Sequence, residues 1–123
     1  ELNMEIAEFM LQNEGAKVTK AWNGQEAVEM FKKSEPGEFD VILMDIMMPV
    51  INGYEAAKRI RSLDREDAKT VPIIAMTANA FTEDRIRAKE AGMDEHIAKP
   101  VDVELLIKAI HGLVEYNRHG SAR

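Results

Sequence analysis

Two short runs of apolar residues constrain the fold of this chain more than any other feature of its sequence. Residues 41–44 read VILM and residues 72–76 read PIIAM, and polar residues bound each run. A continuous apolar run of this length predicts a strand buried on both faces, as in parallel sheets covered by helices on either side. The proline of the second run stands first, where a strand tolerates it.

Helical patterns alternate with these runs along the chain. Residues 2–14 carry an apolar helical face that ends at Gly15, and Asn23 with Glu26 forms an N-cap and capping-box pair for a second helix. Strands alternating with helices predict an α/β fold with a doubly wound parallel sheet. The other predicted elements are strands over 17–21 and 95–98, and helices over 53–63, over 82–91 and from Asp102 onward.

The composition limits the class of protein. The 123 residues suit one domain, which we expect over residues 1–116 with a tail over 117–123. Acidic side chains number 22 against 16 basic ones, and a net charge of −6 argues against direct binding of nucleic acid. There is no cysteine, no apolar run long enough to span a bilayer and no signal-peptide pattern. We therefore expect a cytoplasmic domain that makes no membrane contact.

Three reactive side chains follow three of the predicted strands. Asp45 follows VILM, Thr77 follows PIIAM, and Lys99 follows the strand at 95–98. Ligands of open α/β sheets bind beyond the carboxyl ends of the strands, so these side chains are expected to converge there. Each residue alone is an ordinary turn residue. Together, a carboxylate, a hydroxyl and an ammonium group meet the needs of phosphoryl transfer.

Three segments of the chain resemble a known family. VILMDIMMPVINGYEAAKRIR, PIIAMTANAF and AGMDEHIAKP together are similar to the receiver domain of two-component response regulators. The shared motifs are D-x-x-M-P-x-x-x-G, a strand that ends in T-A, and K-P, and the likeness runs to about residue 114. The residues of these segments are most similar to those of receivers attached to hybrid sensor histidine kinases. The resemblance implies a flavodoxin-like fold with strand order 2-1-3-4-5.

The resemblance also implies a role for each residue of the site. Asp45 would take a phosphoryl group from a phosphohistidine of a kinase or phosphotransfer domain. Lys99, Thr77 and the backbone N–H of Ala78 would bind the phosphate oxygens. The carboxylate of Asp45 and the main-chain carbonyl of Met47 would hold Mg²⁺, a hard cation that takes few carboxylates and keeps several waters.

Two further residues take their roles from the same resemblance. Lys99-Pro100 would form a cis peptide that aims the lysine inward. His96 stands where receivers carry a switch residue that is often aromatic, and it reads equally well as an exposed polar residue on a short strand. Phosphorylation would draw Thr77 and Lys99 toward the new charge and alter the face formed by residues 82–100. The helix at 82–91 suits such movement, because Ile86 is its only large aliphatic residue.

The family's first strand and its acidic pair do not occur in this sequence. The first residues, ELNMEIAEFML, resemble those that follow the acidic pair. That strand would lie between 17–21 and 41–45, so its loss predicts instability, weak magnesium binding and poor phosphorylation. Truncation, a separate N-terminal piece, or self-association with exchange of elements between chains would each explain it.

Other functions fit the sequence less well. A dehalogenase-type phosphohydrolase needs an acid two residues after the nucleophile, and that position is Met47. A flavin or nucleotide module needs a glycine-rich loop after a strand, and none follows the strands present. A degenerate receiver that only docks partners stays open, although Asp45, Thr77 and Lys99 argue against it. As an isolated domain, the chain is expected to accept phosphoryl groups and not to be an enzyme.

Overall fold

A parallel three-stranded sheet forms the centre of the described chain. The computed structural model describes residues 2–13, 15, 19, 21, 23–46, 50–77, 82–99 and 101–119, and the side chains of all these except 2–7, 82–84 and 116–119. The strands are β1 (Ile42–Asp45), β2 (Ile73–Thr77) and β3 (Glu95–Ala98), in the order β1-β2-β3. The α/β fold with a parallel sheet is therefore confirmed.

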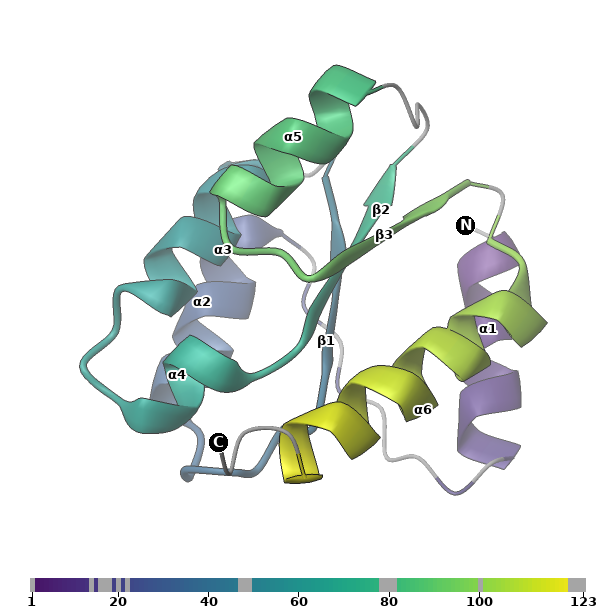
Figure 1. Cartoon of the computed structure of the whole chain (residues 1–123), viewed down its shortest axis with the longest axis horizontal. Coiled ribbons are helices and arrows are strands. Elements are labelled where there is room, and N and C mark those ends of the chain that lie inside the picture. The colour runs from purple at the N-terminus through teal and green to yellow at the C-terminus, as the bar shows by residue number, and fades with distance from the viewer. Residues whose placement is uncertain are drawn as a thin grey trace.

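Helices cover both faces of this sheet. One face carries α2 (Gly24–Lys33), α3 (Gly53–Arg61), α4 (Glu66–Thr70) and α5 (Thr82–Glu90), and the other carries α1 (Leu2–Asn13) and α6 (Val103–His119) (Figure 1). None of the helices in the described part of the chain is long and apolar enough to cross a membrane. Helix α6 continues for three residues into the segment expected to be a tail.

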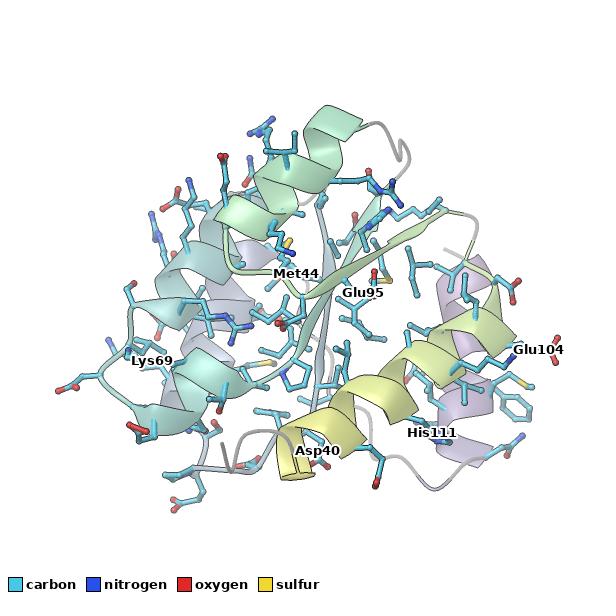
Figure 2. The ribbon with its side chains drawn as sticks, in the orientation of Figure 1. Asp40, Met44, Lys69, Glu95, Glu104 and His111 are labelled. Atoms are coloured by element: carbon cyan, nitrogen blue, oxygen red, sulfur yellow. The ribbon has the colours of Figure 1, made fainter. Side chains whose placement is uncertain are left out.

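Two apolar clusters hold the layers together. Ile73 and Ala75 of β2 face the cluster beneath α2–α5, whereas Ile74 and Met76 face the cluster beneath α1 and α6. Figure 2 shows Met44 in the interior, while Lys69, Glu104 and His111 lie on the outside of the helices. Alternate residues of a strand point to opposite faces, so a buried β2 needs apolar side chains throughout.

The local signals read from the sequence set most of the helix ends. The side chain of Asn23 accepts a hydrogen bond from the N–H of Glu26 at 2.8 Å, and that of Asp102 accepts from the N–H of Leu105 at 3.2 Å. Gly15 has φ of 92° and Gly92 has φ of 94°, the left-handed conformation that ends a helix at a glycine.

Three expectations differ from the structure or lie outside it. The predicted helix over 53–63 ends at Arg61, and the short helix α4 follows, too brief for a helical period to reveal. Strand β1 is only partly buried, because β2 is its one neighbour within the described residues. The strand predicted over 17–21 falls largely outside the described residues, and Thr19 and Ala21, which are described, belong to no strand.

An arginine and an aspartate join α4 to the end of α2. Arg65 donates to Asp67 at 2.7 Å and to the carbonyls of Phe31 and Ser34 at 2.8 and 3.0 Å. Asp67 also accepts from the N–H of Gly37 at 3.1 Å. The hydrogen bond from Arg65, followed by the one from Gly37, lowers the pKa of the Asp67 carboxyl.

This lowered pKa predicts a pH-dependent contribution to stability. A carboxyl whose pKa is lower in the folded chain stabilises it above the unfolded pKa, and the contribution disappears as the pH falls through the folded pKa. We expect Asp67→Asn to lower the melting temperature near neutral pH, by an amount that shrinks at acid pH. Thermal melts across that range measure it, and an equal loss at every pH contradicts the assignment.

Candidate functional site

Asp45 and Lys99 form an ion pair where the strands end. The Lys99 ammonium Nζ lies 2.7 Å from Oδ2 of Asp45, although the two residues are 54 positions apart in the chain. The side chains are 29% exposed for Asp45 and 18% for Lys99, so the pair is half-buried and still open to solvent. Such a charge-assisted contact is stronger than a neutral hydrogen bond.

The strand register brings Thr77 to the same edge. Asp45 pairs with Met76, the residue before Thr77, and Thr77 pairs with Ala98, the residue before Lys99. The N–H of Lys99 donates to the carbonyl of Thr77 at 2.7 Å, which continues the ladder one residue past β3. Thr77 is the one buried polar residue within the described chain. The three predicted side chains therefore share one end of the sheet.

The other predicted site residues have different outcomes. Met47, Ala78 and Pro100 lie outside the described residues, so their expected roles stay predictions. His96 lies on β3, where its Nε2 accepts a hydrogen bond from Nε of Arg85 on α5 at 2.9 Å. No pattern in the sequence points to Arg85, because α5 lacks an apolar stripe that would define which of its faces meets the sheet.

Gly53 packs against the backbone of the acceptor strand, although no role was predicted for it from the sequence. The N–H of Gly53 donates to the carbonyl of Ile46 at 3.0 Å and closes the loop after Asp45. A Cβ at this position would lie 2.6 Å from the backbone oxygen of Asp45. Only glycine permits this approach of α3 to the acceptor strand. The sequence does contain an indication of this role, because Gly53 is the last position of the motif D-x-x-M-P-x-x-x-G.

The loop after Asp45 also holds a strained residue. Val50 has φ of 72°, in the left-handed region that a β-branched side chain rarely adopts. The residue is 73% exposed, so burial does not offset the strain. The helix that follows is capped two residues later, because the side chain of Asn52 accepts from the N–H of Glu55 at 2.9 Å.

Comparison with known families identifies this arrangement. The sequence profile of the response regulator receiver domain matches residues 1–111. The chain belongs to the response regulator receiver family. This places the receiver in two-component signal transduction and confirms the resemblance of the motifs that contain Asp45, Thr77 and Lys99.

Relatives of the receiver include large histidine kinases. It is 34% identical to the peroxide stress-activated histidine kinase mak1 of Schizosaccharomyces pombe, over 94% of this chain and 7% of that protein. It is 41% identical to the hybrid signal transduction histidine kinase M of Dictyostelium discoideum, over 92% of this chain and 5% of that protein. The receiver thus spans a small part of the curated histidine kinases that it matches.

Solved structures share the fold of this receiver. The receiver domain of the sensor histidine kinase PA1611 from Pseudomonas aeruginosa, with magnesium coordinated in its active site cleft, has a TM-score of 0.80 and 36% identity, covering 93% of this chain and 89% of that one. The chemotaxis response regulator CheY4 of Vibrio cholerae has a TM-score of 0.78 and 30% identity, covering 89% and 87%. The flavodoxin-like fold is therefore confirmed.

The close approach of Gly53 to Asp45 predicts a cost for any side chain there. We expect Gly53→Ala to destabilise the receiver by about 1–3 kcal/mol, as overpacking does. Gly112 of α6 is the matched control, since a Cβ there meets no atom within 4 Å. Gly112→Ala should stabilise by up to about 1 kcal/mol through helix propensity. Chemical denaturation measures both, and equal effects contradict the steric argument.

The strain at Val50 predicts a stabilising substitution. Asparagine adopts the left-handed conformation more readily than valine, so we expect Val50→Asn to raise the stability of the receiver by about 1 kcal/mol. Val50→Ile keeps the branched Cβ and should give no gain. Thermal melts of the two variants test this, and a loss of stability in Val50→Asn contradicts it.

Proposed function

We propose that Asp45 accepts a phosphoryl group from a phosphohistidine of a histidine kinase or phosphotransfer domain. The observation that carries this proposal is the 2.7 Å contact between Lys99 Nζ and Asp45 Oδ2 at the end of the sheet. It places a fixed cation beside a carboxylate that solvent can reach. The similarity to two histidine kinases supports a partner of this kind.

The transfer is a single displacement at the phosphorus atom. A carboxylate oxygen of Asp45 attacks the phosphorus, the P–N bond breaks, and its electron pair returns to the imidazole of the donor. The Lys99 ammonium group then faces the added negative charge, and the hydroxyl of Thr77 donates a hydrogen bond to a phosphoryl oxygen. One phosphoryl group is taken up per chain, so the isolated receiver is a substrate of the relay and not an independent enzyme.

Magnesium fits the donor chemistry of this edge. Asp45 supplies one carboxylate, and the described residues contain no group of three His, Cys, Asp or Glu that could hold a metal. Mg²⁺ binds through one or two carboxylates and keeps several waters, so Asp45 and the carbonyl of Met47 would hold it, weakly unless the family's acidic pair completes the site. When bound, the ion neutralises charge on the phosphoryl oxygens. The Pseudomonas receiver, which holds magnesium in its cleft, supports this assignment.

The consequence of phosphorylation is a change in the face formed by residues 82–100. A phosphoryl group adds about −1.5 to −2 charges next to Lys99. That charge draws Lys99 and Thr77, and the segment after Thr77 leads directly into α5. This face, which includes α5 and β3, then presents a different surface to the next protein of the relay.

Phosphorylation of Asp45 is tested by intact mass. The receiver, in a chain that includes the family's first strand and acidic pair, is incubated with Mg²⁺ and a small acyl phosphate, and we expect a gain of one phosphoryl group that Asp45→Asn abolishes. Asp40→Asn is the matched control, because Asp40 lies just before β1, at the opposite end from Asp45 (Figure 2). Thr77→Val and Lys99→Met should slow the gain by removing a hydroxyl and a charge.

The alternative is a receiver that only docks partners. It predicts no mass gain in the wild type while binding to a histidine kinase persists, and binding unchanged by Asp45→Asn. A gain in Asp45→Asn equal to that of the wild type would place the phosphoryl group elsewhere and would contradict the assignment of Asp45.

A further inference from the structure

Helix α5 has few apolar contacts with the body of the receiver. Of its described side chains, residues 85–90, only Ala88 is buried, and Ile86 is 52% exposed. Two arginines supply other contacts. Nε of Arg85 donates to Nε2 of His96 at 2.9 Å, and the Arg87 guanidinium lies 4.3 Å from the ring centre of Tyr54. Among its described side chains, the contacts of α5 with the body therefore come from these two arginines as well as from Ala88.

The Arg85–His96 contact requires a neutral imidazole. A guanidinium group has donors only, so Nε2 of His96 must present its lone pair. The single ring proton is then on Nδ1. A second proton would remove the acceptor and would place two cations at the contact.

Among the described side chains, other charged groups lie near His96 in the chain or on α5. Lys89 lies one turn beyond Arg85 on α5 and adds positive charge, and the carboxylate of Glu95 accepts a hydrogen bond from the backbone N–H of His96 at 3.4 Å. The neighbours on β2 are the uncharged Ala75 and Thr77. Helix α6 packs on the opposite face of the sheet, against Ile97.

His96 also shares a face of the sheet with Thr77. Ala75 pairs with His96 and Thr77 pairs with Ala98, and alternate residues of a strand lie on one face. A change in the position of His96 therefore occurs next to the strand end that carries Thr77.

We propose that Arg85 and His96 form a proton-sensitive latch that holds α5 on the sheet. With a neutral imidazole the latch is closed. A second proton on His96 opens it, and the N-terminal part of α5 separates more readily from β3. This inference goes beyond the phosphoryl-acceptor role and is tested without a phosphodonor, so either proposal can fail alone.

The test is amide hydrogen exchange in α5 of the unphosphorylated receiver. Rates are measured at about pH 7.5 and about pH 5.5, corrected for intrinsic exchange and compared with those of α3. We expect exchange in α5 to rise about three- to tenfold at the lower pH, the range for loss of one hydrogen bond. The rates of α3 should not change, and no rise in α5 overturns the proposal.

Three variants assign the effect to the latch. His96→Phe keeps a ring and removes the acceptor nitrogen, so exchange in α5 should no longer depend on pH. Arg85→Gln keeps a donor without the charge, so the rise should be smaller. His111→Gln alters an exposed histidine of α6 and should leave the rise unchanged. A full rise in His96→Phe overturns the proposal.

A measurement on the wild type does not depend on the folding of any variant. Nitrogen chemical shifts of the His96 ring report which nitrogen carries the proton. The latch requires the Nδ1–H form at the higher pH, and finding the proton on Nε2 overturns it.

Discussion

The register of the three parallel strands is the constraint on which the site depends. Asp45, Thr77 and Lys99 come from distant parts of the chain and meet because β1, β2 and β3 end together. A slip of one residue in a strand turns every side chain to the other face of the sheet. Strand β2 packs side chains of different size into a separate apolar cluster on each face, so a slip would disturb the packing of both clusters. The hydrogen bond between the N–H of Lys99 and the carbonyl of Thr77 extends the same register to the ammonium group.

The sequence was most informative where one local rule was sufficient. Asn23 and Asp102 cap their helices as expected, and β3 has the predicted limits. The convergence of Asp45 and Lys99 followed from the order of strands. Helix α4 was not predicted, because five residues are too few to show a helical period. Arg65, which precedes it, donates hydrogen bonds to the carbonyls of Phe31 and Ser34. Such contacts depend on tertiary placement, which no local pattern encodes.

The close contacts of the site were also beyond sequence reasoning. The need for glycine at position 53 arises from the approach of α3 to the backbone of Asp45. The strain at Val50 arises from the path of the loop that connects them. The partnership of Arg85 with His96 depends on where α5 lies over β3. Each is a property of two segments brought together by the fold.

The two ends of α5 are held in unequal ways. Beyond its C-terminal end, Nε of Arg61 donates to the carbonyl of Gly92 at 2.9 Å, and the same guanidinium pairs with Asp94 at 2.9 Å. Ala91 and Met93 are buried beside them, so this end is fixed to α3 and to the start of β3. Among the described side chains of α5, residues 85–90, Arg85 supplies a polar contact to the sheet. If phosphorylation of Asp45 displaces Thr77 as proposed, the turn at Gly92 is therefore the fixed point about which α5 would pivot.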